Sequence, residues 1–314
     1  MDAIAGLLDG PRARGAFLLR SSLDPPWALR VEDRAPLCIV AVVRGSAWIG
    51  SDDGDTCRLG HGDLALIRGP DAYVVADAPG TPPQAVCGPD QLCTSPGGAL
   101  QELGVRTWGT GLDGETVLLT GTYLSDGEVS RRLLRALPTL VHLPGRELDS
   151  PLVALLADEV VKDHPGQEAV LDRLLDLLLI AVLRAWFARV DAAPPGWYRA
   201  HGDPIVGPAL RLVRHRPSEP WTVASLAAEV GVSRATFARR FADQVGETPM
   251  AFLAGWRIAL AADLLREPGT TLGSVAAQVG YGSPYALSAA FKRHRGMSPQ
   301  QFRRRGAPTE STAA

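Results

Sequence analysis

The sequence lacks a hydrophobic run long enough to cross a membrane. Its most apolar stretch, residues 174–188, is interrupted by Asp176 and Arg184 and is too short to span a bilayer. The opening segment MDAIAGLLDG has no basic residues of the kind that start a signal peptide. Cysteine is also scarce, with four among 314 residues, which excludes a small fold held together by many disulfides. We therefore expect a cytoplasmic protein without a membrane partner.

Excess positive charge is confined to one part of the chain. The net charge is −2, but residues 203–306 carry 14 Lys and Arg against 7 Asp and Glu. Residues 1–202 carry 18 against 26 and are therefore acidic. An acidic region joined to a basic one is typical of a protein that binds nucleic acid at one end only.

The basic region contains the same pattern twice. Residues 222–253 and 271–302 each contain a hydroxyl residue, an apolar segment, a glycine, a serine and a later Gly-x-x-Pro turn at matching places. The matched residues include Gly231 and Gly280, Ser233 and Ser283, and Phe241 and Phe291. Ser and Thr cap helix starts and glycine favours the left-handed position at helix ends, so each copy predicts two short helices joined by a tight turn. This arrangement is a helix-turn-helix.

The second helix of each copy has an apolar face and an opposite, outward face. In the first copy Phe237 and Phe241 share one face at 100° per residue, so Ala235 and Arg239 point the other way. A single arginine among small residues can approach a DNA groove closely and bind a guanine edge with two hydrogen bonds. The outward residues of the second copy include Tyr285, Ala289 and Lys292.

Several short motifs accompany the repeat. They are V-S-R-A-T-F-A-R-R-F at 232–241, G-x-x-P at 246–249, W-R-I-A-L-A-A-D-L-L at 256–265, V-G-Y-G-S at 279–283, A-F-K at 290–292 and G-M-S-P-Q-Q-F-R at 296–303. With them, residues 204–306 resemble the DNA-binding domain of AraC/XylS-type transcription regulators. The resemblance implies two helix-turn-helix units, 222–246 and 271–296, that bind double-stranded DNA. An apolar helix expected over 250–267 would hold them about one DNA turn apart, roughly 34 Å.

The resemblance also implies which residues face DNA. Those expected in the first unit are Ser233, Arg234, Ala235, Thr236, Ala238, Arg239 and Arg240. Those expected in the second are Ser283, Pro284, Tyr285, Ser288, Lys292 and Arg293. We interpret Arg239 as the base reader, with a solvated surface arginine as the alternative. Ala289 stands where many family members have a basic or polar residue, which favours backbone contact by the second unit.

Short apolar segments alternate with turns in the first part of the chain. The segments that predict strands are 27–31, 37–43, 47–49, 57–59, 64–67, 73–75 and 115–124. Many short strands at regular spacing indicate a β-sandwich or barrel. V-R-G-S-A-W-I at 43–49 and L-G-H-G-D-L-A-L-I-R-G-P at 59–70 resemble the cupin-like sensor domain of many such regulators, which implies a small-molecule effector. Candidate pocket residues, each of which could equally be core or surface, are Trp27, Arg44, Trp48, Arg68 and Tyr73.

The sequence lacks the metal ligands of catalytic cupins, which are two close histidines, a carboxylate and a later histidine. The corresponding stretch has Cys38, Ile39 and Val40 and then a single His61. We therefore expect no metal, no cofactor and no enzyme. His61 is interpreted as an exposed turn residue and Cys38 as part of the core.

Cys87 and Cys93 lie in the Pro/Gly-rich connection 81–112, with five residues between them. Cytoplasmic cysteines are normally reduced, so a permanent disulfide is not the default expectation. A redox switch needs two accessible thiols on flexible backbone, which a long loop provides. Unremarkable loop cysteines are the favoured interpretation, and a redox switch or metal capture stays open.

Helical periodicity predicts helices over 133–140, 152–161 and 169–190, within a helical part at 127–190 that completes a first domain of residues 1–190. The last helix is apolar on more than one face, so it is either an ordinary core helix or, as the resemblance favours, a dimer interface. The candidate interface residues are Leu171, Leu174, Leu178, Val182 and Trp186. Residues 191–203 are predicted to be a linker and 307–314 a disordered tail.

These features predict an α+β protein of two domains. A cupin-like β-sandwich or barrel with following helices precedes an all-α double helix-turn-helix domain. The expected function is a sequence-specific transcription regulator that senses an effector, forms a homodimer and could contact RNA polymerase. A redox-gated regulator is the alternative, and a cupin enzyme fused to a DNA-binding domain is disfavoured by the missing ligands.

Overall fold

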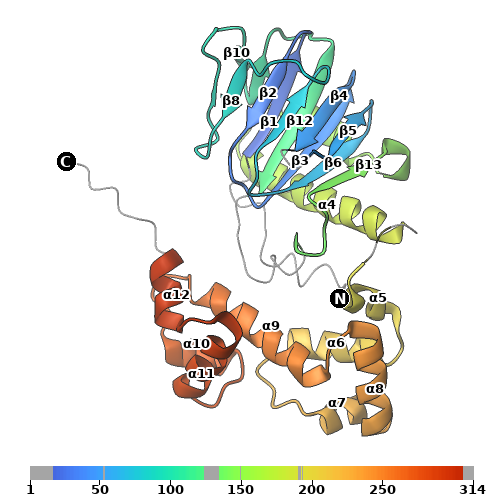
Figure 1. Cartoon of the computed structure of the whole chain (residues 1–314), viewed down its shortest axis with the longest axis vertical. Helices are drawn as coiled ribbons and strands as arrows, with labels where there is room; N and C mark the ends of the chain where they lie inside the picture. Colours follow the sequence, from blue (N-terminus) through green and yellow to red (C-terminus); the bar gives the residue numbers. More distant parts are fainter. Residues whose placement is uncertain are drawn as a thin grey trace, which may run out of the picture. The chain divides into compact units, whose positions relative to one another are not determined.

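The computed structural model describes residues 17–51, 54–123, 134–148, 150–189, 192 and 194–306. These residues form two compact units that divide at Pro194 (Figure 1). The first unit is rich in strands and the second is entirely helical. The expected two-domain α+β class is confirmed.

Two sheets packed face to face form the β-rich unit. The larger has the order β10-β11-β1-β12-β3-β6-β13 and the smaller β5-β4-β7-β2-β8-β9. The strands of the larger sheet are β10 (Gln101–Gly104), β11 (Thr107–Gly109), β1 (Phe17–Leu23), β12 (Thr116–Tyr123), β3 (Leu37–Arg44), β6 (Leu64–Arg68) and β13 (Leu140–Leu143). Those of the smaller sheet are β5 (Thr56–Leu59), β4 (Ala47–Ser51), β7 (Tyr73–Ala76), β2 (Ala28–Val31), β8 (Ala85–Cys87) and β9 (Cys93–Thr94).

The central strand β3 is apolar along its length because both of its faces are covered. Val40 enters the core between the two sheets. On the opposite face Ile39 and Leu175 both border Gly121, and Leu175 belongs to α4 (Gln167–Ala188). The Tyr123 hydroxyl donates a hydrogen bond to the Leu175 carbonyl oxygen over 2.7 Å. Helices α4 and α3 (Leu152–Glu159) therefore pack on the outer face of this sheet.

The strands expected between residues 27 and 75 are present as β2 to β7, and the strand expected at 115–124 is present as β12. The expected connection 81–112 contains the short strands β8 to β11, and β1 is a further strand that the pattern does not predict. The helix expected over 133–140 is wrong for most of its length: among the described residues only Leu134 is helical, residues 135–139 are turn or coil, and Leu140 begins β13, in which Leu143 pairs with Leu64 of β6. Residues 127–133 lie outside the described residues.

Helix α4 is a core helix rather than the expected dimer surface. Four of the five candidate interface residues are at most 9% exposed within this single chain: Leu171, Leu174, Leu178 and Val182. Trp186 is half-buried, and the Arg189 guanidinium lies 5.2 Å from its ring centre. The dimer assignment is therefore wrong for those four residues. The helix is apolar on more than one side because it packs on both the sheet and α3.

The helical unit contains both expected helix-turn-helix units. The first is α7 (Val223–Glu229) with α8 (Arg234–Val245), and the second is α10 (Leu272–Gln278) with α11 (Pro284–Arg295). Helix α9 (Pro249–Leu264) joins them and α12 (Pro299–Gly306) follows. A capping box starts α7: the Thr222 hydroxyl accepts from Ser225 N over 3.0 Å, and the Ser225 hydroxyl accepts from Thr222 N over 2.9 Å. Gly231 and Gly280 end the first helices with φ of 69° and 80°, as the repeat predicts.

Residues 196–203 belong to this unit and are not the expected linker. The short helices α5 (Gly196–Arg199) and η2 (Ala200–Gly202) precede α6 (Val206–His215). Trp197 is only 5% exposed, and the Arg214 guanidinium lies 5.2 Å from its ring centre. Gly196 packs so closely on Val245 of α8 that a Cβ there would lie 2.6 Å from the Val245 carbonyl oxygen. Tertiary packing thus orders a segment whose composition is typical of a linker.

Candidate nucleic-acid interface and N-terminal cavity

Helix α8 presents a mixed face of small and basic residues. The Ser233 hydroxyl caps it by accepting from Thr236 N over 3.2 Å. Phe237 and Phe241 are fully buried, and their rings pack edge to face with their centres 5.6 Å apart. These anchors orient the helix so that Arg239 is exposed. The other exposed residues on this side are Ser233, Arg234 and Ala235, with Thr236 and Ala238 half-buried.

Arg240 differs from its neighbour Arg239 because its guanidinium is paired with a buried carboxylate of the same domain, although the Arg240 side chain is itself 41% exposed. Its Nη2 and Nε lie 2.7 and 3.0 Å from Asp203 Oδ2, which also accepts from Gln244 Nε2 over 2.6 Å. The Asp203 side chain is 6% exposed. Burial acts to raise the pKa of Asp203, but hydrogen bonds from Arg240, two backbone N–H groups and Gln244 outweigh it and lower the pKa to about 2. We expected Arg240 at the rim of the DNA interface, whereas its guanidinium is already paired.

Helix α11 presents a different surface from α8. Ser283 caps it by accepting from Ala286 N over 3.1 Å, and Pro284 occupies the first turn. Leu287 and Phe291 are fully buried, while Tyr285 is 87% exposed. The remaining outward residues are Ala289, Lys292 and Arg293, which are exposed, and Ser288, which is half-buried. Positive charge thus lies in the last turn of α11, and an aromatic ring lies in the first.

Helix α9 joins the two helix-turn-helix units rigidly. Its 16 residues make a helix about 24 Å long. Near its start Phe252 contacts Phe241 of the first unit edge to face at 5.8 Å. Towards its end Ile258, Ala261 and Ala262 belong to the core formed with α10 and α11. Because both units share buried contacts with one helix, their spacing is set by that helix.

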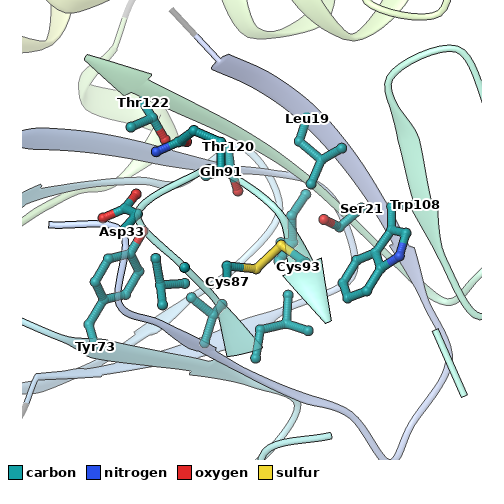
Figure 2. A pocket seen from close by; sticks show the side chains of 15 residues that line it. Leu19, Ser21, Asp33, Tyr73, Cys87, Gln91, Cys93, Trp108, Thr120 and Thr122 are labelled. Carbon is teal, nitrogen blue, oxygen red and sulfur yellow. A yellow bond between two sulfur atoms is a disulfide. The ribbon is translucent and has the colours of Figure 1, made fainter. Parts of the chain in front are cut away.

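A small cavity of about 40 Å³ lies in the core of the β-rich unit (Figure 2). Its wall is mostly apolar and includes Trp108, and its polar groups come from Asp33, Ser21, Thr120 and Thr122. Two further polar atoms on residues of this wall are buried: Gln91 Nε2, which has no hydrogen-bond partner among the described residues, and Tyr73 Oη, whose hydrogen-bonding neighbour is the Cys38 thiol. Burial is also the main cause that raises the pKa of Tyr73, so its hydroxyl remains protonated and can donate.

Only Tyr73 of the five candidate pocket residues lines this cavity. Trp27 is fully buried in the core, and Arg44 donates to the Gly114 carbonyl. Arg68 lies within 3.5 Å of the Thr139 hydroxyl. Trp48 lines a separate groove of about 440 Å³ beside the Pro-rich segment 79–83. Of the five candidates, Trp27 is therefore core, Trp48 borders the groove, and Tyr73 alone lies at this cavity. Gln91 was missed, since nothing in its local sequence marks a residue that folds back into the core.

Cys87 and Cys93 are joined in a disulfide, which corrects the expectation of unbridged loop cysteines. They are directly opposite each other on β8 and β9. Both sulfurs lie at the cavity in Figure 2. The pairing was hidden in the sequence because strands of three and two residues have no readable pattern.

Within the described part of the chain, no cluster of three or more His, Cys, Asp or Glu could hold a metal ion. His61 is exposed in a turn, as expected, with its Nδ1 2.8 Å from the Val43 carbonyl oxygen. Among the same residues, no helix is both long and apolar enough to cross a membrane.

Comparison with known proteins matches both parts of the chain. A family model described as a cupin matches residues 2–188, and a helix-turn-helix domain model matches residues 226–305. An AraC-like transcription regulator of Streptomyces lividans is 35% identical over 88% of this chain and 90% of its own. The regulator AlkR of Acinetobacter baylyi is 29% identical over 96% of this chain and 99% of its own. Among solved structures, the DNA-binding domain of AdpA in complex with a target DNA is similar at 33% identity, covering 33% of this chain and 93% of that one, with a TM-score of 0.31.

The fold and these matches define a DNA-binding transcription regulator with an N-terminal cupin domain. The chain belongs to the AraC-like transcription regulators.

Proposed function

We propose that this regulator reads DNA sequence mainly through α8, with Arg239 as the base-reading residue. The observation that carries the proposal is the contrast between two adjacent arginines. Arg240 is paired with Asp203, whereas Arg239 is exposed and makes no ion pair with any described residue. A free guanidinium flanked by Ala235 and Ala238 can enter a major groove and bind guanine O6 and N7.

Helix α11 is proposed to bind the phosphates of the DNA backbone. Its exposed Lys292 and Arg293 can neutralise phosphates, which supplies affinity without sequence information. Ala289 offers no hydrogen bond to a base. The exposed ring of Tyr285 can pack on sugar or base methyl groups at the edge of the groove.

Substitution of Arg239 and Lys292 separates these two roles. Arg239→Ala should cost about 1–3 kcal/mol of binding free energy on the specific site and relax preference at one base position. Lys292→Ala should weaken binding to all sequences alike and lower the slope of log affinity against log salt by about one. Fluorescence anisotropy on specific and random duplexes over a salt series measures both effects.

Arg173→Ala, an exposed substitution on α4 of the β-rich unit, is the control for charge removal and should leave both titrations unchanged. Equal losses on specific and random DNA for Arg239→Ala and Lys292→Ala would contradict the division of labour.

The cavity of the cupin domain is the proposed effector site. Gln91 Nε2 is a buried donor without a partner among the described residues, and the buried Tyr73 Oη has only the weakly accepting Cys38 thiol beside it, in a cavity whose wall is mostly apolar. Leaving such groups unpaired costs free energy, and a ligand with a hydrogen-bond acceptor would recover it. The proposed effector is therefore a small, largely apolar molecule carrying at least one acceptor atom.

Removal of the Tyr73 hydroxyl tests this site. Tyr73→Phe should change the free energy of unfolding by less than about 1 kcal/mol, since the partner that its hydroxyl loses, the Cys38 thiol, is a weak acceptor. Compounds that raise the melting temperature of the wild-type protein should bind this variant about tenfold more weakly, the loss of about one hydrogen bond. Tyr285→Phe, a matched change on α11, should bind them normally. If the compounds raise the melting temperature equally in wild type, Tyr73→Phe and Tyr285→Phe, the assignment of the effector site is contradicted.

Homodimer formation, contact with RNA polymerase and action in the cytoplasm remain proposals, as does the absence of enzymatic activity. If the chain dimerises through its N-terminal helices, the exposed apolar residues Leu155, Val170 and Leu177 of α3 and α4 are the available surface. Sedimentation velocity of wild type and Leu177→Arg tests this surface, and a dimer that survives the substitution unchanged would exclude it.

A further inference from the structure

We propose that Cys87 and Cys93 form a thiol-exchange site that latches the loop of residues 88–92 over the N-terminal cavity. A dithiol reductant would open the latch, and a peroxide would close it. The proposal deepens the proposed effector function and rests on it for its regulatory meaning. The latch itself is a property of the β8–β9 hairpin.

The disulfide is the strongest tie on the edge of the smaller sheet. Strand β8 is held to β2 by a parallel ladder in which Val86 pairs with Arg30, and by a hydrogen bond of 2.8 Å from Glu32 N to the Cys87 carbonyl oxygen. Strand β9 has only two residues and pairs with β8 alone. Such a short edge strand has few backbone bonds to keep it in place. The link from Cys93 to Cys87 therefore fixes its position.

The loop between the two cysteines is otherwise weakly anchored. Leu92, its one large apolar residue, is 64% exposed. The turn is held by backbone hydrogen bonds from Gly88 N to the Leu92 carbonyl oxygen (3.0 Å) and from Gln91 N to the Gly88 carbonyl oxygen (3.1 Å). Gln91 adopts a left-handed conformation with φ of 63°, which non-glycine residues rarely adopt. Few buried apolar contacts and a residue with strained backbone favour local opening once the disulfide is reduced.

The same loop closes the cavity. Gly88, Gln91 and both cysteines contribute to its wall, and Figure 2 shows the disulfide facing Trp108 across it. In the bridged state the cavity holds about 40 Å³. Ligand pockets usually enclose about 300–1,000 Å³, so the bridged cavity admits only a very small molecule, and an effector of ordinary size needs the cavity to enlarge. Movement of this loop would enlarge the cavity directly, because the loop is one of its walls.

The Cys87–Cys93 disulfide opens by thiol–disulfide exchange with a dithiol. One thiolate of the dithiol attacks one sulfur of the bridge, its second thiolate resolves the mixed disulfide, and two protons pass to Cys87 and Cys93 as the dithiol is oxidised. In the reverse direction hydrogen peroxide oxidises the two thiols to the bridge and is reduced to two waters. Both cysteines are half-buried, so each is partly open to solvent.

The other two cysteines do not compete in this exchange. Burial, followed by the nearby Asp33 carboxylate, raises the pKa of Cys38 to about 12. Burial is also the main cause that raises the pKa of Cys57 to about 11. Both therefore remain protonated at neutral pH and react slowly, since the thiolate is the nucleophile.

Hydrogen exchange of the full-length protein with and without dithiothreitol tests the latch. Reduction should speed exchange of amides 88–93, among which Pro89 has no N–H, at least tenfold and leave the amides of β2 and β7 unchanged. The double variant Cys87→Ser/Cys93→Ser should show the same fast exchange without reductant. Cys57→Ser, a cysteine on β5 of the same sheet, is the control and should match wild type in both conditions.

Two results would overturn the latch. One is equal exchange of amides 88–93 in the bridged and reduced proteins. The other is faster exchange throughout both sheets on reduction, which would make the disulfide a support of the whole fold. If the loop opens as expected while Tyr73→Phe binds every compound normally, the latch stands and the effector site fails. If the loop stays closed while Tyr73→Phe loses binding, the effector site stands and the latch fails.

Discussion

Adjacent residues of the same type have different roles in this protein. Arg239 and Arg240 are identical in charge and follow each other on α8, but a rotation of 100° separates their directions. Arg239 is exposed, whereas Arg240 reaches Asp203, which the sequence places 37 residues away. A sequence pattern predicts that one arginine faces outward, but it does not reveal the buried carboxylate that holds the other.

The Asp203 carboxylate should make the helical unit sensitive to acid. Its pKa is about 2 in the folded protein and about 3.9 in unfolded chains, so the folded state favours the ionised form. The resulting stability is fully present above about pH 4 and is lost as the pH falls through about 2. Asp203→Asn should lower the free energy of unfolding at pH 7 by about 2 kcal/mol, because it removes charge-assisted hydrogen bonds from a buried site.

Urea unfolding followed by helical circular dichroism from pH 7 to pH 2 measures this effect. The wild-type protein should lose more stability between pH 4 and pH 2 than Asp203→Asn does. Asp243→Asn, an exposed change on α8, should follow the wild type. A pH dependence that is the same in all three proteins would show that the Asp203 carboxylate does not contribute in this way.

At the scale of elements, local signals predicted those parts of the fold whose structure is locally determined. The helices of the two helix-turn-helix units begin at hydroxyl caps such as Thr222 and Ser233 and, for α7 and α10, end at Gly231 and Gly280, all of which act within a few residues. Strands β2 to β7 were readable because turn residues separate their short apolar runs. The class of fold and the location of the DNA-binding helices therefore follow from the sequence.

Elements that depend on distant partners were not predictable in the same way. Strand β13 exists because it pairs with β6, whereas the helix expected over 133–140 ran into its first residue. Helix α5 is ordered by the burial of Trp197, although the surrounding Pro and Gly residues suggest a linker. The candidate site shows the same limit: Tyr73 was expected at the cavity, but Gln91 and the disulfide reach it only through the pairing of β8 with β9.

At the scale of the whole molecule, the two units have opposite charge and separate tasks. The basic residues 203–306 carry the DNA-binding surface, and the acidic residues 1–202 contain the cavity and its disulfide. Within the helical unit, α9 fixes the spacing of the two helix-turn-helix units. One chain should therefore contact two neighbouring major grooves about 34 Å apart, with base reading concentrated in one of them.

Methylation interference on a selected site tests that arrangement most directly. A duplex chosen from a random library by the full-length protein is methylated at guanine N7 and bound by wild type or Arg239→Ala. The wild-type protein should show one group of guanines at which methylation strongly interferes with binding, and at most weak interference one helical turn away. Arg239→Ala should lose interference at a single guanine of the strong group and nowhere else. Equally strong interference in both grooves, or an unchanged pattern for Arg239→Ala, would contradict the account.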